Sequence, residues 1–204
     1  MKSVQRVLVI GNYPADKQES MSRVARLLVR TYWQLGQHVE LAQPHVLVAR
    51  LPGLPSVVRK YLAYIDKLIL FPLRLLWHSR AFDLVHIADH SNAFYSFCFS
   101  RQRSLVTCHD LLAMRGAMGD LSAACEPSVI GIWLQRLIRI GLIRCRAVAF
   151  ISQATCDDYQ SLIGFPNYQR HAVIHLPLNA PFIANPDFYS LARAEQCLVQ
   201  IGRA

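Results

Sequence analysis

Short apolar runs alternate with longer amphipathic runs along most of this 204-residue sequence. The apolar runs have the length of buried strands, and the amphipathic runs repeat their apolar residues at helical spacing. A chain that alternates strands with helices pairs its strands in parallel, because each parallel connection has to cross over the sheet. We therefore expect an α/β fold with a Rossmann-like, doubly wound, mainly parallel sheet. Its strands are expected over residues 6–11, 38–42, 82–88, 104–109, 147–151 and 171–175.

Capping and stop signals mark the helices between these strands. Ser20 or Ser22 is expected to cap the first helix, and Gly36 to end it. The longest helical pattern covers residues 57–78, and Pro72 is expected to bend it because proline lacks a backbone N–H. Further helices are expected over residues 92–101, 130–144 and 152–163.

The charge of the chain is positive and unevenly distributed. There are 22 Lys and Arg residues against 13 Asp and Glu, and residues 1–80 alone carry a net charge of +8. Such a field favours anionic partners, which include nucleic acid, an acidic membrane surface and phosphorylated metabolites. The sequence has no zinc-finger spacing, RNP-type strand or basic heptad region, so no nucleic-acid partner is expected.

Cysteines and apolar segments indicate the compartment. The six cysteines contain no C-x-x-C pair, so we expect reduced, mostly buried thiols and neither a disulfide framework nor a metal site. Only four consecutive apolar residues precede Gly11, which is too few for a signal peptide. Charged residues interrupt the apolar stretch over residues 57–77, which therefore does not fit an ordinary membrane span. A cytoplasmic protein is expected.

A basic stripe runs along the longest helical pattern. Lys60, Lys67, Arg74 and His78 follow one another at spacings of seven, seven and four, which places them on one side of a regular helix. Lys60, Lys67 and Arg74 are therefore candidates for contact with an anionic membrane, on which a basic amphipathic helix can lie. The alternative is an ordinary packing helix whose charged stripe faces water.

Polar residues follow several of the expected strands, at the edge where parallel sheets bind their ligands. The candidates for substrate binding are Gly11, Asn12, Asp89, His90, Asp110 and Ser152, and the candidate catalytic residue is His109. An imidazole at the edge of a cleft can exchange hydrogen bonds or protons with a sugar hydroxyl or a phosphate near neutral pH.

Most of these candidates also have a purely structural interpretation. Gly11 can help to bind an anion at the start of a helix, or it can form a tight turn. Asp89 and His90 can line a cleft, or they can belong to the cap of the helix that follows. Ser152 fits a helix N-cap first, and His109 can be a surface residue or a satisfied core residue.

The C-terminal part of the sequence differs from the rest. Residues 1–176 carry the alternating pattern, whereas residues 177–195 contain three prolines and are typical of an interdomain linker. Residues 196–204 are expected to form the first strand of a truncated second domain. The alternative is an extra strand that completes the first sheet.

Five ordered motifs resemble those of a known family. They are V-L-V-I-G (residues 7–11), V-T-C-H-D (106–110), A-F-I-S-Q-A-T (149–155), H-A-V-I-H-L-P-L-N-A-P-F (171–182) and L-V-Q-I-G-R (198–203). In this order and spacing they are similar to the retaining glycosyltransferases of the GT-B fold, specifically the large family-four group. The resemblance covers essentially the whole chain.

The resemblance implies a function and a place in a larger protein. The chain would be the N-terminal, acceptor-side half, and a missing C-terminal domain would bind the nucleotide-sugar donor. The implied reaction transfers a sugar, in the manner of a hexosyltransferase and with retention, to a glycan or lipid-linked acceptor without a metal or cofactor. The isolated chain would be inactive. Relatives that act on lipid-linked acceptors suggest peripheral attachment at the inner membrane face.

The resemblance also suggests roles for individual residues. His109 matches a strand-end histidine close to the reacting sugar, where it would act as a base or as an orienting group. Gly11 matches a glycine turn near the donor phosphates, but Asn12 stands where the family often has a second glycine. Ser152 matches a serine at a strand end. The alternative function is a non-catalytic Rossmann-like module that binds an anionic glycan or a membrane surface.

Overall fold

The computed structural model describes residues 5–48, 55–120 and 128–177. The chain divides into two units, residues 1–174 and 175–204, and all helices and strands described below belong to the first unit. From residue 178 onward, the linker and the final strand expected from the sequence lie outside the described residues.

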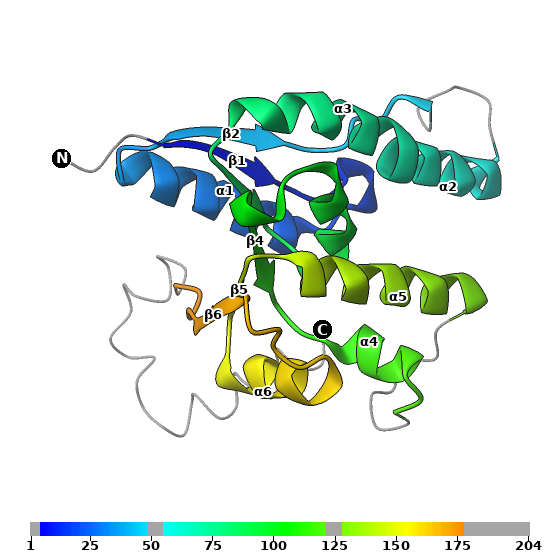
Figure 1. Cartoon of the computed structure of the whole chain (residues 1–204). Coiled ribbons are helices and arrows are strands. Elements are labelled where there is room, and N and C mark those ends of the chain that lie inside the picture. Colours follow the sequence, from blue (N-terminus) through cyan, green and yellow to red (C-terminus); the bar gives the residue numbers. More distant parts are fainter. Residues whose placement is uncertain (1–4, 49–54, 121–127, 178–204) are drawn as a thin grey trace, which may run out of the picture. The chain divides into compact units, whose positions relative to one another are not determined.

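Six parallel strands form one sheet in the order β2-β1-β3-β4-β5-β6 (Figure 1). Their bounds are Arg6–Ile10 (β1), His38–Ala42 (β2), Leu84–Ile87 (β3), Ser104–Cys108 (β4), Ala147–Phe150 (β5) and Arg170–Val173 (β6). Four consecutive buried residues in β1 explain its unbroken apolar run, because both faces of this strand are covered. The predicted α/β, Rossmann-like fold is confirmed.

Helices cover both faces of the sheet. The α-helices are α1 (Glu19–Gln34), α2 (Ser56–Ile65), α3 (Phe71–His78), α4 (Leu112–Ala117), α5 (Val129–Arg144) and α6 (Gln153–Leu162). Short 3₁₀-helices are η1 (Pro14–Asp16), η4 (Ser79–Ala81), η5 (His90–Cys98) and η6 (Arg101–Arg103), and η3 (Asp66–Leu70) is a π-helical turn.

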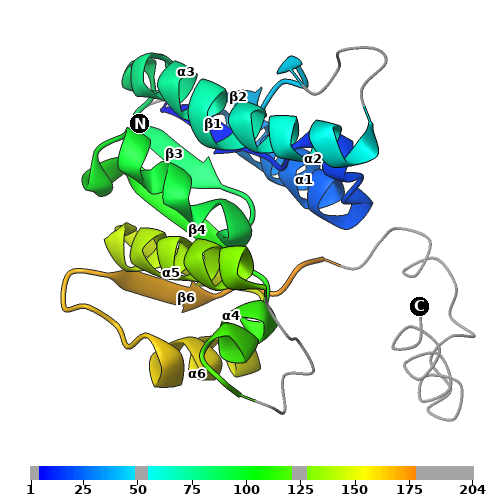
Figure 2. The same cartoon turned by 90° about the vertical axis from the view of Figure 1, so that its right-hand side faces the viewer.

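Two hydrophobic clusters separate the two faces. Val7, Val9 and Ala88 pack with Ala25 of α1 on one face. On the other face, Leu8 and Ile10 belong to the larger cluster that includes residues of α3, η5 and α5. Figure 2 shows α2, α3 and α5 in front of the sheet on this second face. Alternation of side chains along β1 thus divides its apolar residues between the two layers.

The strand order places a topological switch between β1 and β3. The connection after β1 leads through α1 to β2 on one side, whereas the connection after β3 leads through η5 to β4 on the other. Because the two connections diverge, a crevice opens beyond the carboxyl ends of β1 and β3, which is where doubly wound sheets bind ligands.

The termini of α1 correct one prediction. The helix begins at Glu19 with Gln18 at the N-cap position, so neither Ser20 nor Ser22 caps it. The chain enters it through Lys17, whose φ of 53° reverses the backbone two residues before the helix starts. The predicted stop is confirmed, because Gly36 follows the helix with a φ of 74°.

The segment expected as one bent helix over residues 57–78 contains a π-helical turn. The turn η3 lies between α2 and α3, and Pro72 is the second residue of α3. Proline cannot donate a backbone hydrogen bond, and its ring needs space beside the preceding turn. The wider π turn provides that space, so the irregularity lies before Pro72 and not at it.

Two shorter segments also differ from expectation. Residues expected as a helix over 92–101 form the 3₁₀-helix η5, which starts earlier, at His90. The six-residue helix α4 was not predicted, because it lacks a side-chain cap and is too short for an amphipathic period to be visible. In the described ranges, none of the helices has the length and hydropathy needed to cross a bilayer.

Candidate functional site

Asn12 joins the ends of β1 and β3 across the switch point. Its side chain is 3% exposed and its Nδ2 donates to Gln18 Oε1 at 2.5 Å and to Asp89 Oδ2 at 2.6 Å. Its Oδ1 accepts a hydrogen bond of 2.9 Å from Asn92 Nδ2. Both amide donors are therefore used, and the side chain acts as a fixed clamp at the centre of the crevice.

Asp89 is a buried carboxylate at the end of β3. It caps η5, because Oδ1 accepts from the backbone N–H of Ser91 at 3.0 Å, and Oδ2 accepts from Ser91 Oγ at 2.6 Å. Burial opposes ionisation, but hydrogen bonds from His90, Ser91 and Asn12 outweigh it and hold the pKa of Asp89 below its usual range. The capping interpretation of Asp89 is confirmed, and the site carries a fixed negative charge.

His90 lies between Asp89 and the end of β4. Its Nδ1 is 3.2 Å from Asp89 Oδ1 and 3.5 Å from the backbone nitrogen of His109. An ionised carboxylate only accepts hydrogen bonds, so Nδ1 carries the proton and donates to Asp89. The longer contact then brings two donors together, His90 Nδ1–H and the backbone N–H of His109, and is not a hydrogen bond.

His109 follows β4 and is 8% exposed. Its Nε2 lies 2.9 Å from the backbone carbonyl of Ala88, which can only accept, so Nε2 carries a proton. In the neutral ring Nδ1 is then the basic nitrogen, and no residue of the described ranges forms a hydrogen bond with it. The ring is thus oriented by the end of the neighbouring strand.

Ser152 and Thr155 extend the same edge of the sheet to β5. Ser152 is the N-cap of α6, where its Oγ accepts from Thr155 N at 3.2 Å and donates to Thr155 Oγ1 at 2.9 Å. Thr155 Oγ1 in turn donates to the backbone carbonyl of His109 at 3.1 Å. The capping interpretation of Ser152 is confirmed, and the cap supports the backbone of His109.

Gly11 packs against a side chain at the end of β2. Its N–H donates to Ala42 O at 2.9 Å, and a Cβ at this position would lie 2.9 Å from Gln43 Nε2. The nearest α-helix begins only at Glu19, after η1, so Gly11 does not lead directly into a helix N-terminus as expected. The observed contacts fit the tight-turn interpretation.

Asp110 is exposed and lies apart from the clamp formed by Asn12 and Asp89. Its Oδ1 accepts from the backbone N–H of Leu112 at 3.2 Å, at the start of α4. The structure therefore brings Asn12, Asp89, His90, His109 and Ser152 into one row along the sheet edge, and it leaves Asp110 outside that row.

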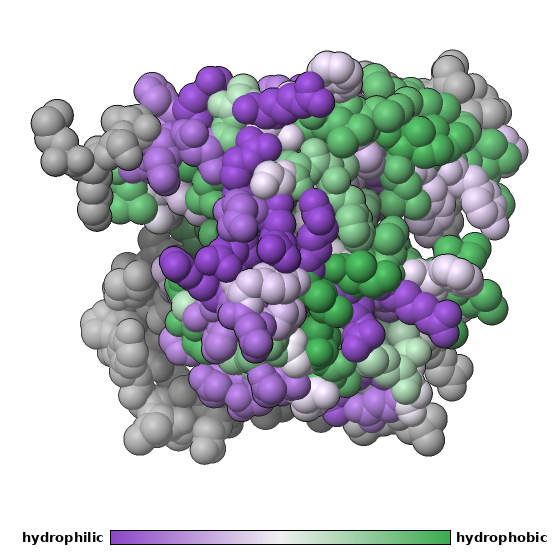
Figure 3. All heavy atoms as spheres, viewed as in Figure 1, coloured by the Kyte–Doolittle hydropathy of each residue, from purple (hydrophilic) through white to green (hydrophobic). Residues whose placement is uncertain are grey.

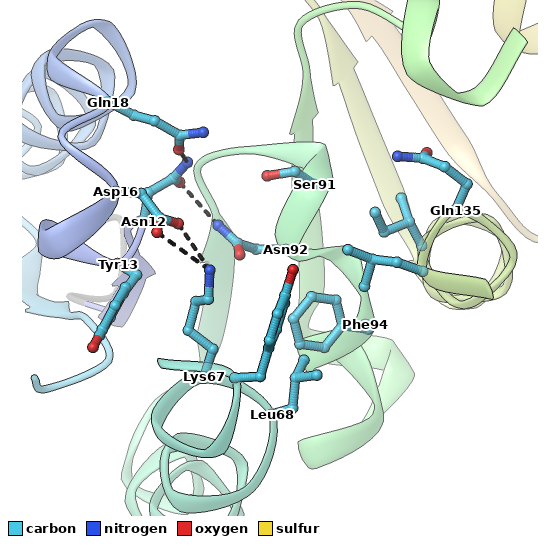
Figure 4. A pocket seen from close by; sticks show the side chains of 13 residues that line it. Asn12, Tyr13, Asp16, Gln18, Lys67, Leu68, Ser91, Asn92, Phe94 and Gln135 are labelled. Atoms are coloured by element: carbon cyan, nitrogen blue, oxygen red, sulfur yellow. Dashed lines mark hydrogen bonds and ion pairs between the residues drawn. The ribbon is translucent and has the colours of Figure 1, made fainter. Parts of the chain in front are cut away.

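A cavity of about 190 Å³ opens beside Asn12, between η3 and α5. Figure 4 shows the Lys67 ammonium pointing toward Asp16, which it meets at 3.0 Å. The same ammonium lies 5.3 Å from the ring centres of Tyr13 and Tyr64. The remaining lining residues are Gln18, Leu68, Ser91, Asn92, Phe94, Leu134, Gln135 and Ile138.

Asp66 holds the wall of this cavity in place. It is 1% exposed and accepts hydrogen bonds from Tyr13 OH at 2.9 Å and from the backbone N–H groups of Leu47 and Val48 at 3.2 and 3.0 Å. These contacts fix η3 against the loop after β1 and so place Lys67. Sequence reasoning missed this role, although a lone carboxylate in an apolar run is a signal of a buried, hydrogen-bonded group.

The basic stripe expected along residues 57–78 does not form one continuous surface. Lys67 turns into the cavity, Arg74 is exposed and contacts His45, and His78 Nε2 lies 2.7 Å from Glu40 Oε1. The side chain of Lys60 lies outside what the structure describes. Membrane contact by these residues stays a prediction, but Lys67 does not occupy the surface position on which it was based.

The histidine inside β3 has a structural role. His86 Nδ1 lies 2.9 Å from Tyr32 OH, and Nε2 lies 2.8 Å from Thr107 Oγ1. Burial lowers the pKa of His86 to about 3, with a smaller contribution from His109, so the ring is neutral. Within the described ranges, no group of three or more His, Cys, Asp or Glu side chains is placed to hold a metal ion.

Three of the four described cysteines are buried, and all four are free thiols. Burial raises the pKa of Cys98 to about 11 and that of Cys145 to about 12. These thiols are therefore protonated and unreactive near neutral pH, in agreement with the interpretation of the cysteines as core residues.

Comparisons with known proteins agree with this geometry. Glycosyltransferase Family 4 matches residues 21–180 of the chain. Among solved structures, the chain is similar to Glycyrrhiza uralensis UGT73P12 complexed with glycyrrhetinic acid 3-O-monoglucuronide, with a TM-score of 0.50 and 7% sequence identity. That similarity covers 84% of this chain and 49% of the other, so the chain spans about half the length of the structure that it matches.

Comparison with curated proteins gives no significant match. The family match covers well over half of the chain, and the fold comparison agrees with the half of a GT-B architecture expected from the motifs. The chain belongs to Glycosyltransferase Family 4.

Proposed function

We propose that this chain is the acceptor-binding half of an enzyme that transfers a sugar from a nucleotide-sugar, with retention, to a glycan or lipid-linked acceptor. The observation that carries the proposal is the row of oriented polar side chains from Asn12 through Asp89 and His90 to His109, of which Asn12 lines an open cavity. This row lies at the carboxyl edge of the sheet, where α/β proteins bind their ligands.

In the proposed reaction, His109 acts on the acceptor hydroxyl. Its protonated Nε2 is held by the Ala88 carbonyl, so the basic Nδ1 is the nitrogen that would accept a hydrogen bond from that hydroxyl. The nitrogen would either take the proton or only orient the hydroxyl while the departing diphosphate takes it. Both versions need the imidazole in the orientation that the β3 and β4 ends support.

The other polar residues would position the acceptor and keep the site rigid. Asp89 and Asn12 would hold the crevice open at a fixed width, because their hydrogen bonds are already made before a ligand arrives. His90 would hold the Asp89 carboxylate, and Ser152 would support the backbone of His109 through Thr155. Gly11 would lie near the donor phosphates, and Asp110 would contact the substrate from the exposed margin of the site, where its carboxylate accepts from Leu112 N.

The proposal includes a second, donor-binding domain that stabilises the leaving diphosphate, and it includes no metal or cofactor. Positioning and electrostatic stabilisation would supply most of the rate acceleration. The proposed enzyme is a transferase of hexosyltransferase type. It would be inactive as the isolated chain and attached peripherally to the inner face of a membrane.

Nucleotide release tests the proposal. This chain and a version extended through the following reading frame are each incubated with a panel of nucleotide-sugars and candidate acceptors. We expect turnover only by the extended protein, and a loss of at least about a hundredfold in His109→Ala, in the range typical of a removed acid–base group. His38→Ala removes an exposed histidine of β2 and should leave turnover unchanged.

The second candidate function is a non-catalytic module that binds an anionic glycan or a membrane surface. The net charge of +9 supports this alternative. Tight binding of such ligands, together with no nucleotide release by either version of the protein, would establish it in place of the enzyme.

A further inference from the structure

Exposed apolar side chains flank the cavity between η3 and α5. On one side they are Val57, Val58, Tyr61 and Leu68, and on the other they are Val129, Ile130, Trp133 and Leu137. Scattered single apolar residues are ordinary on protein surfaces, but two groups on facing helices beside one cavity are not. Figure 3 shows hydrophobic residues gathered over α2 and α3 and over part of α5.

Both groups continue the lining of the cavity along their helices. Tyr61 precedes the lining residue Tyr64 by three positions within α2. On α5, Ile130 precedes the lining residue Leu134 by four positions. Residues three, four or seven apart lie on the same side of a helix, so the apolar surface runs from the cavity outward on both walls.

Positive charges predominate around these apolar groups. Asp66 is the only acidic residue in 56–80, and it is 1% exposed, whereas Arg59, Arg74 and Arg80 are exposed. Residues 128–144 contain no acidic residue and three arginines. Asp16, which lines the cavity and has a side chain that is 36% exposed, is paired with Lys67. A surface that combines apolar side chains with an excess of cations is complementary to an anionic lipid surface.

The aromatic residue of the α5 group fits the boundary of a bilayer. Trp133 is 66% exposed, and the guanidinium of Arg136 lies 5.8 Å from the centre of its ring. A tryptophan beside an arginine can place its ring among acyl chains and headgroups while the cation contacts phosphate.

We propose that the exposed apolar residues of α2 and of the N-terminal half of α5 dock on an anionic lipid bilayer, with the cavity between η3 and α5 opening toward the headgroups. The inference deepens the proposed function and rests on it in one respect: a lipid-linked acceptor would enter the site from the membrane. It replaces the basic stripe by two apolar groups as the membrane contact, and the arginines add electrostatic attraction.

Single-tryptophan proteins test this directly, because the chain has three tryptophans, at positions 33, 77 and 133. Trp33 is 71% exposed at the end of α1, on the opposite face of the sheet, and is a matched control for Trp133. One protein keeps Trp133 and carries Trp33→Phe with Trp77→Phe. The control keeps Trp33 and carries Trp77→Phe with Trp133→Phe.

Vesicles of phosphatidylcholine with about 30% phosphatidylglycerol are added to each protein, and vesicles of phosphatidylcholine alone are the neutral comparison. We expect the emission of Trp133 to shift to shorter wavelength with anionic vesicles and to be quenched by brominated lipid. The emission of Trp33 should not change.

A second measurement compares two pairs of serine substitutions in vesicle sedimentation. Ile130→Ser with Trp133→Ser should lower the partition coefficient at least about tenfold, because two apolar side chains no longer enter the bilayer. Trp33→Ser with Leu35→Ser removes comparable apolar side chains from the C-terminal end of α1 and its C-cap, and it should leave partitioning unchanged. Equal thermal midpoints by circular dichroism would show that both variants fold.

Three results would overturn the inference. They are equal responses of Trp33 and Trp133, binding that does not depend on anionic lipid, and a shift of Trp133 that follows protein concentration without vesicles, which would indicate a second copy on this surface. Loss of vesicle binding with transfer to a soluble acceptor intact contradicts this inference alone. Intact vesicle binding without transferase activity in the extended protein contradicts the proposed function alone.

Discussion

Asn12 and Lys67 line the same cavity, but their surroundings differ. Asn12 is 3% exposed and all of its amide hydrogens are bound, whereas the side chain of Lys67 is 21% exposed and pairs with an Asp16 side chain that is 36% exposed. The first is a buried amide in a network that cannot move without leaving polar groups unpaired. The second is a partly hydrated ion pair that exchanges partners at little cost.

The contrast shows how the cavity divides its tasks. The strand ends provide a fixed floor, in which Asp89 keeps its charge through hydrogen bonds that exist before any ligand binds. The wall formed by η3 provides a cation that can change its partner when an anionic group enters. A site of this kind orients the reacting part of a ligand and tolerates variation in the rest.

Removal of the carboxylate from the floor should have the largest effect. Asp89→Ala leaves the buried donors of Asn12 and Ser91 without an acceptor, so we expect the free energy of unfolding to fall by about 3 kcal/mol. Asp110→Ala is the matched control at the end of the next strand, where the carboxylate is exposed and accepts from Leu112 N, and it should cost less than about 1 kcal/mol. Urea denaturation of both variants measures the two losses of unfolding free energy. Equal losses would contradict the distinction between the buried Asp89 and the exposed Asp110.

The pH dependence of the unfolding free energy should reveal the buried histidine of β3, His86. The pKa of His86 is about 3 in the folded protein, well below its usual value, so between these two values the unfolded chain binds one proton more than the folded one. Stability therefore rises with pH in this window and is lost as the pH falls below about 6.5. From pH 6.5 to pH 5 the free energy of unfolding should drop by about 1.5 kcal/mol through this group.

His86→Gln is the variant that isolates this effect. Glutamine retains hydrogen-bonding groups toward Tyr32 and Thr107 but does not titrate. The difference in unfolding free energy between the two proteins is measured at several pH values across the window. A difference that stays constant would show that His86 has the same pKa in the folded and unfolded states, which contradicts the lowered value.

Patterns between residues that are close in the sequence predicted several helices, strands and caps. Apolar runs predicted the strands β1 and β2, and helical spacing predicted the helices α5 and α6. A glycine after the first helical pattern predicted the stop at Gly36, which has a positive φ. The caps at Asp89 and Ser152 were among the interpretations because a cap joins residues two or three apart.

Contacts between distant parts of the chain were not predictable in this way. Asn12 meets Asp89 and Asn92 across 77 and 80 residues, and a single sequence contains no signal for such a pairing. The stripe that included Lys67 assumed a regular helix over residues 57–78. A π turn accommodates an extra residue, so side chains after Asp66 are rotated relative to that regular helix, and Lys67 reaches the cavity.

Loss of the cation from the wall should have the smallest effect on stability. Lys67→Met keeps most of the apolar stem of the side chain and removes its charge, so the free energy of unfolding should change by less than about 1 kcal/mol, as for other partly exposed ion pairs. Asp66→Asn, at the adjacent buried position, should cost more, because Asp66 accepts from Tyr13 and from two backbone N–H groups.

Lys67→Met should nevertheless change the ligand preference of the cavity. If the wall supplies an exchangeable cation, affinity for an anionic acceptor or headgroup should fall several-fold while the folded protein keeps its thermal midpoint. A loss of stability as large as that of Asp89→Ala would mean that Lys67 belongs to the rigid part of the site. The cavity would then have no adjustable side, and its selectivity would depend on shape alone.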